Sequence, residues 1–390
     1  MKKHLNAYFV LAAIGLLLFL VLNVINERLN MWDLKVYYGA YEELLKGNSP
    51  YGQSFGLSSG FYKYSPTAAL LFVPLFALGW KASMVIYYVL IGGSMVLALP
   101  EILKDQWSRF TEGLKDNWLP LLLILVLLGG HLSRELFLGN VNWLLFLGLL
   151  VLFKFRNSSP IIAGIVFGLL LVFKPHFIFI IPWLVVRMKW KVLLFSLLSF
   201  AMFLLFPSLF FGWDQNLIWL SEWLGAMKAH NVDLWESANT IYHLFQVFTM
   251  HLLPGPLAVV LMLLLVAGAI FLMTIKHYKR EKSTSKTSIN HEYLEYFIII
   301  ALIPNLVHTD TEHFLWATPL ILIFAAHVVK MNKWFWWLGF AICAIPFGLA
   351  TPDLWGRAGA EWLVKSGAIG AANLFMVLSA YWAVKEKETV

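Results

Sequence analysis

The chain has 390 residues, of which 60% are hydrophobic and only 13% are charged, and its mean hydropathy is +0.73. Soluble domains carry roughly 25% charged residues, so this composition predicts a polytopic membrane protein. The formal net charge is +7, but the basic residues are spread over short loops and both ends of the chain, which argues against nucleic acid as a partner. The single cysteine, Cys343, excludes an intramolecular disulfide and a thiolate metal cluster.

The apolar runs predict about twelve membrane spans, since roughly 20 apolar residues cross the hydrocarbon layer of a bilayer. They begin near Tyr8, Ser83, Trp118, Trp143, Pro160, Phe177, Val192, Gly255, Tyr293, Phe314, Trp334 and Leu363. The first is expected to be an uncleaved helix, because no small-residue cleavage site follows it. Residues 66–79 are also apolar, but this run is short and opens with proline, so we expect a juxtamembrane or re-entrant helix there.

The lysines and arginines that flank these spans predict the orientation of the chain. With residues 66–79 left out of the count, most of them fall on one side of the membrane, which the positive-inside rule assigns to the cytoplasm. Both termini are then cytoplasmic, in a plasma or inner membrane. The outer side receives a first loop at residues 27–82, with juxtamembrane helices, and a large loop at residues 212–254. No repeat or linker divides the sequence, so we expect one integral membrane domain over residues 1–390.

Asp33 lies in the first outer loop, at the start of a predicted amphipathic helix in the membrane interface. The apolar face of this helix, which ends at Gly47, consists of Leu34, Tyr37, Tyr38, Tyr41, Leu44 and Leu45. An aspartate in this place is commonly an N-cap. The nearby aromatic side chains, which are able to stack on sugar rings, and the fixed position at the membrane surface favour a catalytic carboxylate instead.

Lys174 interrupts an otherwise apolar stretch at residues 161–186, and an ionisable group at such depth is a functional candidate. The two flanking arms, residues 160–173 and 177–186, are each short for a full crossing, and both neighbouring loops are basic. They predict a hairpin whose tip lies in the outer leaflet, at a depth that suits the phosphate of a lipid carrier. A lysine that snorkels from a helix end gives the same pattern.

Several stretches of the sequence resemble glycosyltransferase family 87. They are the run from Asp33 through Val36-Tyr37-Tyr38, then Gly47-Asn48-Ser49-Pro50-Tyr51, and then Tyr64-Ser65-Pro66 with the apolar helix that follows. The resemblance is strongest over residues 1–80 and continues more weakly through Gly139-Asn140-Val141-Asn142 and Lys174-Pro175. The chain differs by having Asn140 where the family often has glutamine, and His176 after the Lys-Pro pair. Members of this family are α-mannosyltransferases that use polyprenyl-phosphate-mannose, so the resemblance implies an all-α, GT-C-like fold.

The resemblance also implies roles for individual residues. Asp33 is expected to take the proton of an acceptor hydroxyl as general base, while cations stabilise the leaving phosphate. The candidates for binding the donor phosphate are Lys174, His176 and Arg134. The candidates for binding substrate are Tyr37, Asn48, Tyr51, Tyr64, Asn140, Asn142, His308, Asp310 and His313. No metal or cofactor is expected, because the His308 to His313 spacing is unlike a zinc helix and no nucleotide-binding loop occurs.

The predicted function is therefore transfer of a hexose, mannose by the resemblance, from a polyprenyl-phosphate donor to a lipid or glycan acceptor on the outer face. Inversion of a β-linked donor gives an α-linked product. Two other classes stay open. A lipid-linked glycan ligase or polymerase has the same topology and a lipid substrate. A secondary transporter has its site near the bilayer midplane between related halves, whereas the polar residues here gather at the outer ends of the spans.

Overall fold

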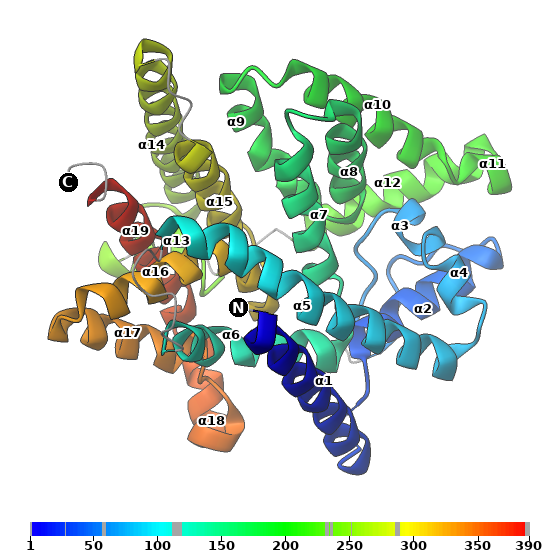
Figure 1. Ribbon diagram of the computed structural model, residues 1–390. Coiled ribbons are helices and arrows are strands. Elements are labelled where there is room, and N and C mark those ends of the chain that lie inside the picture. Colours follow the sequence, from blue (N-terminus) through cyan, green and yellow to red (C-terminus); the bar gives the residue numbers. More distant parts are fainter. Residues whose placement is uncertain are drawn as a thin grey trace. The chain divides into compact units, whose positions relative to one another are not determined.

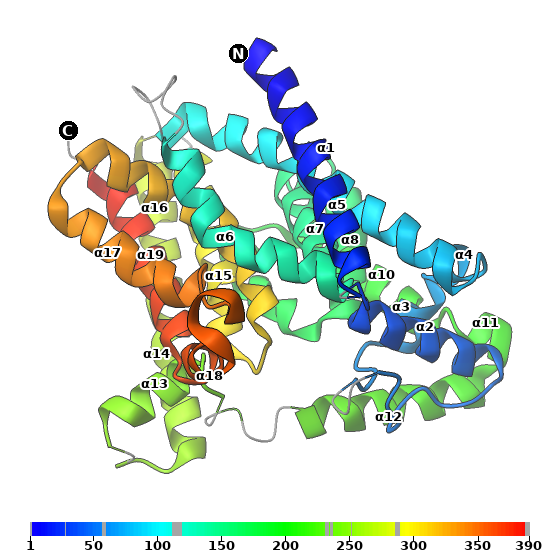
Figure 2. The ribbon, with the colours of Figure 1, turned by 90° about the horizontal axis from the view of Figure 1, so that it is seen from below.

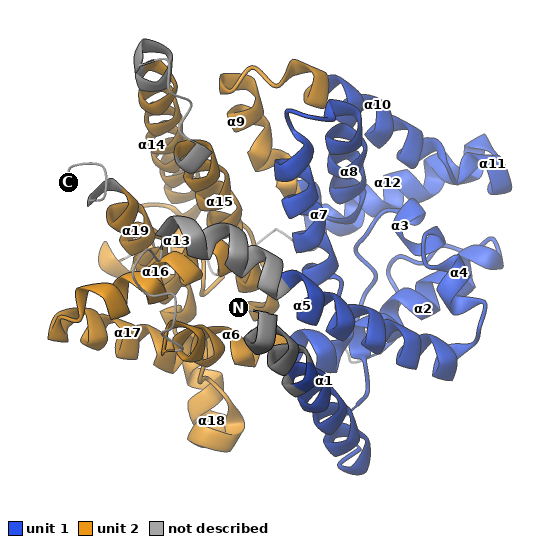
Figure 3. Cartoon of the chain, viewed as in Figure 1, with its two compact units in different colours: residues 1–102, 133–175, 194–229 blue, residues 103–132, 176–193, 230–390 orange. Residues whose placement is uncertain are grey.

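The computed structural model describes residues 2–27, 29–56, 60–110, 119–230, 234, 237–250, 252–284 and 289–386. Within these ranges the chain is helical, and the only strand-like pairing is an isolated antiparallel bridge between Ser54 and Phe61. The all-α expectation is thus confirmed. The backbone forms two compact units that alternate along the sequence (Figure 3). A single domain over residues 1–390 stays a prediction.

The first unit comprises residues 1–102, 133–175 and 194–229. Its complete helices are α1 (Lys2–Ile25), α2 (Trp32–Leu45), α3 (Pro66–Leu70), α4 (Val73–Phe76), α7 (Asn142–Phe155), α8 (Pro160–Phe173) and α11 (Ser208–Phe211). It also holds most of α5 (Trp80–Phe110), α10 (Trp190–Leu205) and α12 (Trp213–His230), and the last part of α6 (Leu119–Leu138). α3 and α4 lie beside α2, and α7 packs along α8 (Figures 1 and 2).

Glycines allow α8 to approach α10 closely. A Cβ atom on Gly164 would overlap Phe195, and one on Gly168 would overlap Ser199. The Ser199 hydroxyl donates a hydrogen bond to the Gly164 carbonyl at 3.1 Å. In lipid, the burial of apolar surface gives little driving force for helix association. Helices there commonly pack through small residues one turn apart, with a serine hydroxyl that bonds across the interface.

Two predicted interruptions of the helices are present. Residues 66–79 contain the short helices α3 and α4 in place of a helix of spanning length. α8 ends at Phe173, and the next residue, Lys174, has an extended backbone (φ −137°, ψ 93°). The 3-10 helix η1 (Pro175–Ile180) and α9 (Ile181–Val186) follow. The extended backbone follows from Pro175, because a proline disfavours the helical conformation of the residue before it.

The second unit comprises residues 103–132, 176–193 and 230–390. With α9 and most of η1 it contains α13 (Ile241–Phe248), α14 (Gly255–Thr284), α15 (Ile289–Leu306), η2 (Thr311–Ala317), α16 (Thr318–Met331), α17 (Trp334–Phe347), α18 (Pro352–Lys365) and α19 (Ala368–Glu386). α16 and α17 both pack against α19 (Figure 2). Buried amides link α15 to α19, since Asn373 Nδ2 donates to Asn305 Oδ1 at 2.7 Å and Asn305 Nδ2 donates to the Gly370 carbonyl at 3.1 Å.

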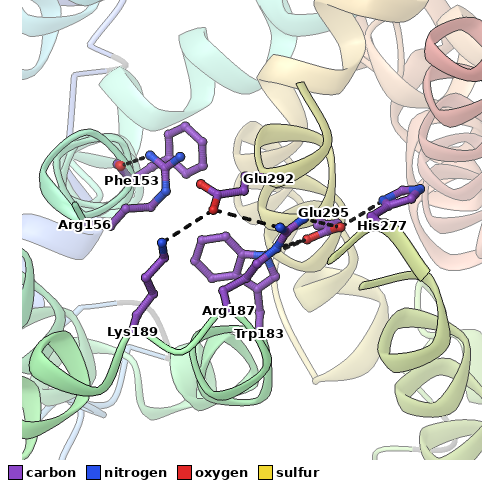
Figure 4. Close-up of polar contacts among 8 residues, drawn as sticks. All are labelled: Phe153, Arg156, Trp183, Arg187, Lys189, His277, Glu292 and Glu295. Carbon is purple, nitrogen blue, oxygen red and sulfur yellow. Dashed lines mark hydrogen bonds and ion pairs between the residues drawn. The ribbon is translucent and has the colours of Figure 1, made fainter. Parts of the chain in front are cut away.

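A buried ionic cluster ties α9, α14 and α15 together in the second unit (Figure 4). The fully buried Glu295 carboxylate accepts two hydrogen bonds from Arg187, at 2.9 Å from Nε and 2.8 Å from Nη2. The Trp183 indole donates to the same carboxylate at 3.0 Å, and His277 Nδ1 lies 2.9 Å from it. Two parallel bonds from one guanidinium are the strong form of this pairing, and the further donors offset the cost of burying the charge.

Among the described residues, five helices are long and apolar enough to cross a membrane: Trp80–Ala98, Leu119–Leu138, Trp190–Phe211, Gly255–Lys279 and Thr311–Met331. A sixth is added if α17 and α18, bent by 82°, are counted as one span. These helices support an integral membrane protein. The predicted total of twelve spans is not confirmed, because α7 and α8, among others, are apolar but shorter.

Candidate active site

Asp33 lies in the first turn of α2 and points its carboxylate at Asn140. Asn140 Nδ2 donates a hydrogen bond to Asp33 Oδ2 at 2.5 Å. The N-cap position is occupied by Met31, which has a left-handed backbone (φ 43°) and whose side chain makes no capping bond. Asp33 is therefore not the N-cap of α2. A carboxylate in the first turn is favoured by the partial positive charge of the helix N-terminus.

The predicted amphipathic helix is confirmed as α2. Its buried face includes Leu34, Tyr37, Tyr41 and Leu44, as expected from their spacing. Leu45 and Tyr38 were assigned to the same face, but the Leu45 side chain is 53% exposed and Tyr38 is only half-buried.

The Asn140 amide has a fixed orientation. Its Oδ1 accepts hydrogen bonds from the Val141 N–H at 2.7 Å and from the Tyr37 hydroxyl at 3.4 Å. The backbone carbonyl of Asn140 accepts a bond from the Tyr87 hydroxyl at 3.2 Å. Because a backbone N–H can only donate, Oδ1 must face Val141, and the amide nitrogen must then face Asp33.

Tyrosines continue this hydrogen-bonded chain away from Asn140. The hydroxyls of Tyr37 and Tyr64 lie 3.2 Å apart, and the Tyr51 hydroxyl donates to the Tyr64 carbonyl at 2.8 Å. Burial, followed by the neighbouring Tyr64 and Asp33, raises the pKa of Tyr37 well above its usual value. The Tyr37 phenol therefore stays protonated at neutral pH and is available as a hydrogen-bond donor.

Lys174 belongs to the same compact unit as Asp33 and lies against this group of tyrosines. Its ammonium nitrogen is 5.7 Å from the centre of the Tyr64 ring, within the range of a cation–π contact. Lys174 is buried, with only 5% of its surface exposed. The structure thus assembles five residues singled out in the sequence, Asp33, Tyr37, Tyr64, Asn140 and Lys174, from three distant parts of the chain.

Glu135 is a polar residue of this region that was not among the site residues predicted from the sequence. It is fully buried on α6, and its carboxylate accepts hydrogen bonds from Trp143 N at 2.7 Å and from Asn142 Nδ2 at 3.4 Å. Asn142, a candidate for substrate binding, is thus engaged with Glu135. The available signal was an acidic residue near the end of a helix whose first part is apolar.

Two candidates of the first unit lie apart from this assembly. Asn48 follows the other end of α2, where its Nδ2 donates to Glu43 Oε2 at 2.9 Å and its N–H to the Glu43 carbonyl at 2.9 Å. Asn48 therefore fastens the end of the helix. Arg134 precedes Glu135 on α6, but its side chain is exposed where that of Glu135 is buried.

The remaining candidates belong to the second unit, in which His176 and His313 approach each other. Their ring centres are 6.2 Å apart, and both rings contact Trp316, at 5.5 Å and 5.0 Å. His313 Nδ1 lies 3.0 Å from the Asp310 carbonyl, so this nitrogen carries a proton. Asp310 itself is the N-cap residue of η2, and the His308 side chain is exposed. Among the described residues, no group of three His, Cys, Asp or Glu side chains is arranged to hold a metal ion.

Comparison with known proteins gives a family match. The family model of glycosyltransferase family 87 matches residues 61–289, more than half of the chain. The matched region contains Tyr64, Glu135, Asn140 and Lys174 and begins after Asp33, whereas the resemblance noted in the sequence was strongest over residues 1–80. Neither the curated proteins nor the solved structures include a match to this chain.

Proposed function

The chain belongs to glycosyltransferase family 87, and on that premise we propose that it transfers a hexose, mannose by the resemblance, from a polyprenyl-phosphate donor to a hydroxyl of a lipid or glycan acceptor. Asp33 is the proposed general base. The observation that supports this best is the orientation of its carboxylate by Asn140, beside Tyr37 and in the same compact unit as Lys174.

In the proposed reaction, the acceptor oxygen attacks the anomeric carbon while the bond from that carbon to the phosphate oxygen breaks. The acceptor proton passes to Asp33, and polyprenyl phosphate leaves with the bonding electrons. A single displacement inverts the configuration, so a β-linked donor gives an α-linked product. One carboxylate is sufficient, because the phosphate leaving group needs cations to stabilise its charge and needs no acid to protonate it.

Lys174 is the proposed partner of the donor phosphate. It is a buried cation at the end of the apolar helix α8, where the tail of a lipid carrier could remain in the bilayer. Arg134 and His176 are further proposed contacts of this phosphate, and His308, Asp310 and His313 of the sugar or acceptor. The proposal places the site on the outer face of the membrane within a GT-C fold, with both termini in the cytoplasm, and it invokes no metal or cofactor.

The test is release of polyprenyl phosphate from synthetic polyprenyl-phosphate-mannose by the purified protein in detergent, with membrane lipid extract or simple mannosides as acceptors. Asp33→Asn keeps the shape of the side chain and removes the base, so we expect kcat to fall by about 10²- to 10⁴-fold. Glu42→Gln is the matched control, since Glu42 is an exposed acid on the same helix.

Wild-type turnover by Asp33→Asn would overturn the assignment of the base. If the wild-type protein releases no phosphate from any lipid-phosphate sugar, the donor class is wrong. Transfer of a whole lipid-linked glycan in the same assay would instead indicate the ligase or polymerase alternative.

A further inference from the structure

Glu135 lies near the end of α6, after a long apolar stretch, with its side chain fully buried. A buried carboxylate is costly unless donors are fixed around it, and such groups in membrane helices usually mark functional sites. Asp33 already fills the role of base in the proposed reaction. Glu135 therefore requires a separate explanation.

The contacts of Glu135 hold both ends of the turn that joins α6 to α7. At one end, the Glu135 carbonyl accepts a hydrogen bond from the Asn140 N–H at 3.2 Å. At the other, its carboxylate accepts bonds from the Trp143 N–H and the Asn142 side chain at the start of α7. One residue thus fixes where the turn begins and where the next helix starts.

The same turn is pressed against the beginning of α2. Gly139 has a left-handed backbone (φ 64°), and a Cβ atom there would lie 3.0 Å from Leu34 Cβ and 3.2 Å from Met31 Cβ. Asn140 is the next residue and donates to Asp33. Any shift of the turn therefore moves the amide that orients the Asp33 carboxylate.

We propose that Glu135 is a positioning residue of the transfer reaction: it fixes the turn that aims Asn140 at Asp33. This inference rests on the proposed function, because it describes how Glu135 acts on the proposed base.

The first test is a double-mutant cycle on kcat with Glu135→Gln, Asn140→Ala and the double variant. Glutamine keeps the shape of the side chain but has one acceptor oxygen for the two donors, Trp143 N–H and Asn142 Nδ2. A misplaced reacting group costs up to about 100-fold in rate, so we expect each single variant to lower kcat by about 10- to 100-fold. The double variant should lose little more than Asn140→Ala alone, because both changes act through the same contact. Glu222→Gln, an exposed acid of the first unit that bonds Ser49, is the matched control.

The second test needs no substrate. Hydrogen–deuterium exchange of the Val141 and Trp143 amides should be faster in Glu135→Ala than in the wild type, and this result is independent of the donor's identity. Failure of the wild type to turn over any lipid-phosphate sugar would thus reject the proposed function while the exchange measurement still reports on the turn.

Three outcomes would overturn the role of Glu135: wild-type kcat in Glu135→Gln, losses that simply add in the double variant, or unchanged exchange at the turn. If Glu135→Gln does not fold, Gly139→Ala displaces the same turn without altering Glu135. We expect it to lower kcat by a similar factor, because its new methyl group meets Leu34.

Discussion

Lys174 combines deep burial with an aromatic neighbour, Tyr64, which suits a cation that receives an anionic group from the bilayer. A hydrogen bond to a charged group contributes about 1.5–3 kcal/mol, so Lys174→Gln should raise the dissociation constant for polyprenyl phosphate by about 10- to 100-fold. Lys174→Arg retains the charge and should bind more tightly than the glutamine variant. The measurement is a binding titration in detergent, with the exposed Lys46→Gln of the same unit as control. Unchanged affinity in Lys174→Gln would remove this residue from the donor site.

Tyr37 is predicted to act only as a neutral donor. Since burial raises the pKa of its phenol, the hydroxyl stays protonated and continues to support Asn140 as the pH rises. Tyr37→Phe removes that support but leaves the bond from Asn140 to Asp33 in place. We therefore expect a smaller loss of kcat than in Asp33→Asn, and an unchanged shape of the pH–rate profile. A basic limb present in the wild type and lost in Tyr37→Phe would contradict this assignment.

The junction of α9, α14 and α15 depends on the ion pair of Arg187 and Glu295. Removing one partner of a buried pair leaves the other charge uncompensated, which costs about 3–5 kcal/mol of stability. Arg187→Met should therefore lower the free energy of unfolding measured in detergent, and adding Glu295→Leu should recover part of the loss. Lys365→Met is the control, because the Lys365–Glu361 pair is exposed and its loss should not change stability measurably. Equal stability of Arg187→Met and wild type would contradict this account.

Helices with a clear local pattern were predictable from the sequence. The spacing of tyrosines and leucines predicted α2. The shortness of residues 66–79 and their opening proline predicted the lack of a full span there, and the two short arms around Lys174 predicted the break. Asn140 and Tyr64 were suspected from the family resemblance. The hydrogen bonds of these two side chains could not be predicted from the sequence, because they depend on which helices pack together. Glu135 was missed for the same reason, since its partners are set by a turn rather than by a periodic pattern.

The hydropathy of the sequence predicted a membrane protein correctly, but it did not determine the number of membrane spans. A count of apolar runs predicted about twelve spans, whereas five or six of the described helices are long enough by themselves. The difference arises because α7, α8 and α9 are apolar but short, and composition alone does not separate a short crossing from a half-crossing or a buried core helix. The predicted side of the membrane for each loop therefore rests on the charge rule, and a labelling experiment tests this prediction directly.

The predicted topology has a simple chemical test because the chain contains one cysteine. In a Cys343→Ser background, Lys46→Cys and Lys333→Cys place single thiols at two exposed lysine positions, one on the predicted outer side and one on the predicted cytoplasmic side. A membrane-impermeant maleimide applied to intact cells should label only the first, and permeabilised cells should show both labelled. Labelling of Lys333→Cys from outside would mean that the chain crosses the membrane an even number of times between these positions, which would reverse the predicted sidedness of residues 308–313.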